Sequence, residues 1–217
     1  ANIETRPIRQ ATVQLLDDTG TIVLDADVLD DLGAYAFTVD AFANVILRVR
    51  ADIKRTGSPS WDVEVRNNVV DPNRDIVDPG ATPLAERPIY VMDSAPMASG
   101  AINQPFDLIA VTGWDGSSYA SERVAAPFSV LDAIYSAMTL ISAEDPSAVF
   151  DPLDAFWSPD NSTVEGDNEP EDYIANGRLG TSFYSDRSLF LLGMAGDDTE
   201  EFDDHVIVHE WGHYFED

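Results

Sequence analysis

The residues His209-Glu210-Trp211-Gly212-His213 form an H-E-x-x-H motif near the end of this 217-residue chain. On a helix, side chains four positions apart lie on one face, so the two imidazoles can bind one metal ion. Glu210 follows the first histidine, where its carboxylate can accept a proton from a metal-bound water. The motif therefore predicts a zinc site with His209 and His213 as ligands and Glu210 as general base.

The segment around the motif has the pattern of an amphipathic helix. Asp198 or Thr199 is expected to cap its start, and the first turns hold acidic residues that the helix dipole favours: Glu200, Glu201, Asp203 and Asp204. An apolar stripe is expected to face the core: Phe202, Val206 and Ile207. The apolar run 206–208 indicates that the histidines do not lie on a solvated helix. Trp211 and Gly212 indicate close packing against a sheet.

A motif of five residues also arises by chance, on a helix whose histidines face solvent or fill a core. Two of the chain's three histidines lie in the motif, which favours the metal site. The third, His205, lies one turn before His209. Three histidines spaced by four residues extend over about 12 Å of helix axis, too far for one ion. We therefore expect His205 to be a neighbour of the site and not a ligand.

A catalytic zinc takes three protein ligands and keeps one position open for water. After His213 the chain offers Glu216, which falls on the same helical face but on the last turn. This is a weak third ligand. We therefore expect residues 1–217 to be the front portion of a longer enzyme, to bind zinc weakly and to be inactive alone.

The charge of the chain narrows its partners. Forty acidic residues against twelve basic ones give a net charge of −28. Nucleic acid is excluded as a partner because its phosphates would be repelled, and anionic membranes are disfavoured for the same reason. The chain contains no run of 18 apolar residues, so the sequence predicts no transmembrane segment. Without cysteine there are no disulfides or thiolate zinc sites. The acidic loop at 158–172 is expected to be solvated, with calcium binding as the alternative.

Alternating apolar residues in the first half predict seven short strands: 10–16, 21–27, 35–39, 45–50, 61–66, 88–93 and 106–112. In the second of these, Ile22, Leu24 and Ala26 are expected to face inward. The connection 69–87 is long and rich in proline and aspartate. Short strands separated by turns predict an antiparallel β-sandwich over 1–112.

From residue 113 the pattern changes. Residues 123–141 have a helical period, with Phe128, Leu131 and Met138 on one stripe. Shorter strands are expected at 149–157, 180–184 and 188–192, followed by the motif helix. The chain is therefore expected to be α+β, with one domain at 1–112 and a second at 113–217.

Residues 7–53 resemble the carboxypeptidase regulatory-like domains, which are small β-sandwiches of transthyretin-like topology. The resemblance is carried by residues 11–15, by the turn 17–20 and by residues 31–37, followed by the alternating strand at Val45. It implies an accessory domain of an exported enzyme or a surface protein.

Residues 113–217 resemble a family of exported bacterial zincin metallopeptidases of gluzincin type. The resemblance is carried by residues 125–128 with Leu131-Asp132, by residues 156–160 and by residues 205–217. It implies the helix–sheet–helix N-terminal lobe of a zincin, ending after the H-E-x-x-H helix. His209 and His213 would be zinc ligands and Glu210 the general base. The third ligand would be a glutamate on a later helix, outside this chain.

The same resemblance implies a peptide or protein substrate that pairs with the strand around 188–192, and a location that is extracellular, periplasmic or at the cell surface. The sequence leaves two alternatives to a peptidase. One is a non-catalytic surface or adhesion module with a vestigial metal helix, which a zinc assay on the longer protein would separate. The other is a zinc hydrolase that acts on a non-peptide amide, which substrate profiling would separate.

Overall fold

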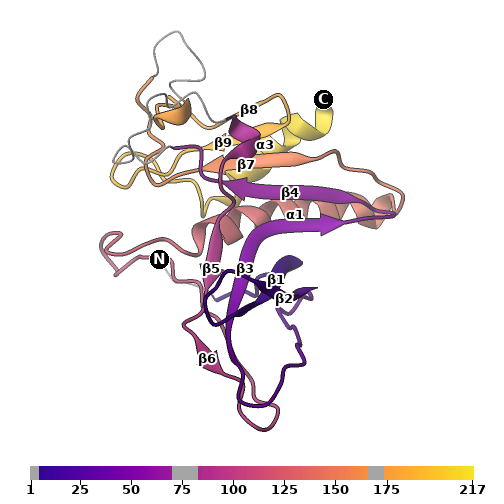
Figure 1. Ribbon diagram of the computed structural model, residues 1–217. Helices are drawn as coiled ribbons and strands as arrows, with labels where there is room; N and C mark the ends of the chain where they lie inside the picture. The colour runs from indigo at the N-terminus through magenta and orange to yellow at the C-terminus, as the bar shows by residue number, and fades with distance from the viewer. Residues whose placement is uncertain (1–4, 70–82, 166–173) are drawn as a thin grey trace.

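The computed structural model describes residues 5–69, 83–165 and 174–217 (Figure 1). In these ranges a mixed sheet of nine strands carries two long helices, which confirms the α+β class. The strands are β1 (Ala11–Asp17), β2 (Val23–Val28), β3 (Asn44–Arg55), β4 (Trp61–Arg66), β5 (Val91–Asp93), β6 (Met97–Ala98), β7 (Leu153–Trp157), β8 (Phe183–Ser185) and β9 (Ser188–Leu191). The helices are α1 (Ala126–Glu144), α3 (Asp204–Glu216) and the short 3-10 helix η2 (Leu84–Glu86).

The sheet continues from the first half of the chain into the second. Its strand order is β2-β1-β3-β4-β7-β9-β8. β5 and β6 lie outside this order and pair with the 12-residue strand β3, at residues of β3 that precede those paired with β4. The pairs among β1 to β6 are antiparallel, whereas β4–β7 and β7–β9 are parallel. A side-chain contact also joins the two halves of the chain: Arg9 Nε donates to Asp132 Oδ1 at 2.5 Å. The division into domains at 1–112 and 113–217 stays a prediction.

Four of the seven strands expected in the first half are present as β1 to β4, and the one at 88–93 is shortened to β5. The strands expected at 35–39 and 106–112 are wrong. These two segments have no regular secondary structure and no strand partner in the described ranges. Tyr35 instead donates its hydroxyl to the carbonyl of Phe106 at 2.7 Å, and its ring packs against the buried side chains of β1 and β3.

The inward face expected for β2 is also wrong. All six residues of β2 are exposed, and Leu24 keeps 55% of its surface. The register explains the difference. Asp25 pairs with the buried Leu15, so the aspartate lies on the core side, while Ala26 pairs with Gln14 on the opposite face. Because β2 ends the sheet, little of the chain lies beside it.

Both long helices lie on one face of the sheet (Figure 1). Alternate residues of β7 and β9 face the helices, and the intervening Phe156 and Phe190 stack at 5.1 Å in a second cluster on the other side. The apolar stripe predicted for 123–141 is confirmed in α1, whose buried residues include Phe128, Leu131 and Met138. The packing of this core therefore fixes α1 and α3 relative to β8 and β9, the strands beside α3.

In the described part of the chain, α1 is the one helix with the length and hydropathy of a membrane span. Of its most apolar window, 56% is buried inside the protein. A helix that packs on β3 and β4 needs such residues for its core face, so packing accounts for the composition.

Candidate functional site

The motif helix α3 starts later than the sequence indicates. Its N-cap is Asp203, whose carboxylate accepts the amides of His205 at 3.0 Å and Val206 at 3.4 Å. The caps expected at Asp198 and Thr199 are wrong, since both lie in the irregular segment before the helix. Of the four acidic residues expected in the first turns, only Asp204 is there.

Replacing Asp203 with alanine is expected to lower the free energy of unfolding by about 0.5–2 kcal/mol, the usual loss for an N-cap side chain. Urea unfolding followed by circular dichroism measures this. Asp198→Ala removes the same charge from an exposed residue outside the helix and is expected to change stability much less. Equal losses in the two variants would contradict the assignment of the cap.

The buried face of α3 consists of Ile207, Glu210, Trp211 and Tyr214, which recur at helical spacing. Ile207 from the predicted stripe is fully buried, but Phe202 lies exposed before the helix. His209 and His213 are exposed, so the expectation of an unsolvated pair is wrong. The expected close approach at Gly212 is also wrong, because a side chain there would meet nothing within 4 Å.

The two histidines of the motif lie together. Their ring centroids are 4.9 Å apart and their planes are nearly perpendicular, at 84°. Two imidazoles bound tetrahedrally to one zinc, with Zn–N of about 2.0–2.1 Å, have centroids about 5 Å apart. The pair therefore fits two positions of a zinc site. Among the described residues, no group of three histidine or acidic side chains could hold an ion.

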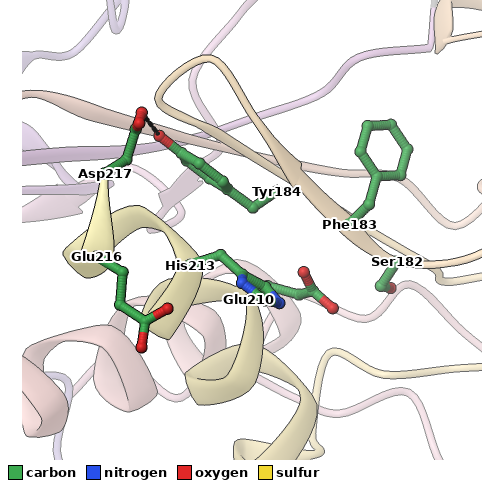
Figure 2. Close-up of a pocket in the computed structure, with 7 residues that line it drawn as sticks. All are labelled: Ser182, Phe183, Tyr184, Glu210, His213, Glu216 and Asp217. Atoms are coloured by element: carbon green, nitrogen blue, oxygen red, sulfur yellow. Dashed lines mark hydrogen bonds between the residues drawn. The ribbon is translucent and has the colours of Figure 1, made fainter.

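Glu210 and His213 face an open groove of about 550 Å³ between α3 and β8 (Figure 2). His209 lies beside it through its ring contact with His213. The groove is lined by Ser182, Phe183, Tyr184, Glu210, His213, Glu216 and Asp217. In Figure 2 the carboxylate of Glu210 extends beneath the strand, while that of Glu216 points away from it. The groove therefore brings the predicted base and one predicted ligand to the same surface.

The strand beside this groove is β8, not the segment 188–192 expected to bind substrate. β9 is paired with β7 on one side and β8 on the other, so it has no free edge. β8 is the last strand of the sheet and pairs only with β9 among the described strands. Around the turn Asp186-Arg187, Ser185 pairs with Ser188, so Ser185 and Phe183 bond to β9. The backbone N–H and C=O of Tyr184 therefore point to the free edge.

Polar contacts hold the walls of the groove. The hydroxyl of Ser182 donates to Glu200, and burial raises the pKa of that carboxyl. Burial, with the charge of Asp151 as a smaller cause, raises the pKa of Tyr214 to about 12. Its hydroxyl therefore stays protonated and donates to the carbonyl of Asp151 at 2.6 Å. Tyr184 donates its hydroxyl to Asp217 Oδ2 at 2.9 Å (Figure 2).

Sequence reasoning missed a buried ion pair that positions α3. Arg123 Nη1 donates to Glu201 Oε1 at 2.5 Å, and the two side chains are 4% and 0% exposed. Arg123 also donates to the carbonyl of Gly193, and its guanidinium lies 5.1 Å from the ring of Trp157. A Cβ atom at residue 193 would lie 2.3 Å from the carbonyl oxygen of Ser158, so the close contact between residues 193 and 158 requires glycine. The pair ties the start of α1, the end of β9 and the approach to α3 together.

The calcium alternative at 158–172 falls partly outside the described residues, which omit Asp167, Asn168 and Glu169. Within the described part of the loop, Asn161 is fully buried and its amide is bonded to Asn68 at 2.8 and 3.0 Å. Asn161 is therefore a structural residue.

The comparisons with known proteins add no relative. The chain matches no protein-family model, and searches of curated proteins and of solved structures found no significant match.

Proposed function

We propose that this chain carries the zinc ligands and the general base of a metallopeptidase. The observation that supports this most is the arrangement on α3. The rings of His209 and His213 are 4.9 Å apart, and Glu210 lies between them in sequence and faces the groove under β8. The two imidazoles and the carboxylate at this spacing correspond to two of the three protein ligands and to the general base of zinc-dependent hydrolysis.

Each residue has one role in this proposal. His209 and His213 hold the zinc through one imidazole nitrogen each. When bound, zinc lowers the pKa of its water towards about 7 and polarises a carbonyl. Glu210 accepts the proton of the attacking water and passes it to the leaving amine. Its place at the sheet-facing side of α3 directs its carboxylate into the groove, where a substrate would lie.

The substrate in this proposal is an extended peptide that adds to β8 as a further strand. The free backbone groups of Tyr184 would bond to the peptide, as in other cases of strand addition. The groove would then take the scissile bond between β8 and Glu210.

The proposal also covers the fold of the two parts of the chain. The mixed sheet with both long helices on one face and an antiparallel edge strand beside α3 supports the N-terminal lobe of a zincin for 113–217. β1 to β6 form antiparallel pairs within one sheet, so the regulatory-like sandwich proposed for 1–112 rests on the resemblance of residues 7–53. Export to the cell surface, the periplasm or the medium rests on the resemblance alone.

A third ligand is needed, and we propose that it is a glutamate from sequence beyond residues 1–217. The described residues offer two nitrogen ligands and no third group at ligand distance. A site with two protein ligands binds zinc weakly and lacks the fixed geometry of a catalytic centre. Residues 1–217 alone are therefore expected to bind zinc without turnover.

Zinc titration of the 217-residue chain tests the site directly. His209→Ala and His213→Ala are each expected to weaken zinc binding by at least about tenfold, since even indirect partners of a ligand contribute 10–100-fold. His205→Ala is the matched control, because it removes an exposed histidine one turn away. It is expected to leave the affinity unchanged. Calorimetry at moderate salt limits zinc binding by the acidic surface.

The proposal fails if all three variants bind zinc like the unsubstituted chain. Zinc binding that depends on His209 and His213 in a longer chain that cleaves no peptide would point to a hydrolase for another amide. A longer chain that binds no zinc would support the adhesion module with a vestigial helix.

A further inference from the structure

The outer edge of β2 is an exposed strand edge with apolar side chains. β2 ends the sheet opposite β8, and its exposed residues include Val23, Leu24 and Val28. Exposed edge strands with apolar and β-branched residues are templates for pairing with another chain. The backbone groups along this edge therefore decide whether β2 can recruit a further strand.

The amides of β2 alternate between β1 and the open edge. Leu29, directly after β2, donates its N–H to the carbonyl of Ala11 in β1 at 3.0 Å, and its carbonyl accepts the N–H of Gln10, directly before β1, at 3.1 Å. Counting back in steps of two, Asp27 and Asp25 also face β1. The amides of Ala26 and Val28 therefore point to the open edge.

Both outward amides are already bonded to a carboxylate. The N–H of Ala26 donates to Asp25 Oδ1 at 2.9 Å, and the N–H of Val28 donates to Asp27 Oδ1 at 2.8 Å. An incoming strand would have to break these two charge-assisted bonds and bring its own carbonyl oxygens against two carboxylates. Both steps oppose pairing.

The position of the two aspartates supports a role in blocking the edge. The register places them on the same face as the buried Val13 and Leu15, although both aspartates remain exposed at this end of the sheet. Charged side chains on an edge strand are one of the devices by which natural sheets avoid pairing. At the opposite end of the sheet, none of the described side chains is bonded to the outward amide of Tyr184.

We propose that Asp25 and Asp27 close the outer edge of β2 to strand addition by occupying its two outward amides. The edge thus excludes both a second copy of this chain and an extended segment of another protein. This inference does not depend on the proposed zinc chemistry, because it concerns the other end of the sheet.

Sedimentation velocity over a range of protein concentrations tests the proposal. The double variant Asp25→Ala with Asp27→Ala removes both acceptors and is expected to self-associate, so that its sedimentation coefficient rises with concentration. Asp25→Asn with Asp27→Asn loses the same two charges but keeps a carbonyl acceptor at each position. It is expected to sediment like the unsubstituted chain. An alanine pair that does not associate, or an asparagine pair that associates equally, would overturn the proposal.

A third variant locates the contact. Ala26→Pro, added to the alanine pair, removes one of the opened amides on the solvent side of an edge strand, where proline is tolerated. It leaves the bonds to β1 intact and is expected to restore the sedimentation of the unsubstituted chain. Association at the level of the alanine pair would place the contact elsewhere and overturn the proposal. Circular dichroism verifies that each variant keeps the fold.

Discussion

Replacing Glu210 with glutamine is expected to lower kcat for peptide hydrolysis by about 10²- to 10⁴-fold, the usual contribution of a positioned general base. The comparison requires a chain that holds residues 1–217 together with a third zinc ligand. Glutamine has the size of glutamate but cannot take the proton of the water. Zinc affinity is expected to stay unchanged, because His209 and His213 remain. Turnover and zinc binding are measured on the same preparations.

Glu216→Gln is the matched control for this experiment. It makes the same chemical change in the other glutamate that lines the groove. Glu216 is exposed and its carboxylate points away from β8 (Figure 2), so its replacement is expected to leave kcat nearly unchanged. Full activity in Glu210→Gln, or an equal loss in the two variants, would remove Glu210 as the base.

The largest loss of stability is expected from Arg123→Met, which should lower the free energy of unfolding by about 3–5 kcal/mol. Methionine keeps much of the packing of the arginine stem against Trp157 but removes the charge. Glu201 is then left fully buried without the partner of its carboxylate. Leaving a buried charge uncompensated costs far more than the pair itself contributes. Urea or thermal unfolding measures the loss.

Two comparisons separate the buried charge from other effects. Arg187→Met breaks an ion pair with Asp151 whose side chains are 59% and 57% exposed. Exposed pairs of this kind contribute about 0–1 kcal/mol, so little change is expected. Adding Glu201→Leu to Arg123→Met removes the uncompensated charge and is expected to recover part of the stability. A double variant that is less stable than Arg123→Met would show that packing, and not charge, dominates at this site.

The motif helix shows which part of the site a sequence can predict. The helix, the pairing of His209 with His213, and the burial of Ile207 follow from the 3.6-residue period. The start of the helix does not, because several acidic residues before it could act as a cap. The ion pair of Arg123 with Glu201 joins residues 78 positions apart and fixes the position of the segment that leads into the helix. No periodicity within a single segment carries that information.

The sheet shows the same limit. Alternation in 10–16 and 61–66 predicts β1 and β4, but it cannot say which strand lies at the edge. β8 is the edge because β9 lies between it and β7, which depends on the parallel pairing of distant strands. The inward face expected for β2 is wrong because the register of β2 with β1 places Asp25 and Asp27 on the same side as the buried Val13 and Leu15. At the end of a sheet, apolar alternation does not guarantee burial.

The parallel pairing of β4 with β7 sets a lower limit on any working piece of this protein. β7 lies between β4 and β9, and Val65 of β4 packs in the same core as Ala155 of β7. A piece cut at residue 113 would keep the metal helix but leave β7 with a bare edge and an opened core. The smallest piece expected to hold α3 in its native setting must therefore begin before Trp61, so that a designer has to carry part of the front half along with the motif.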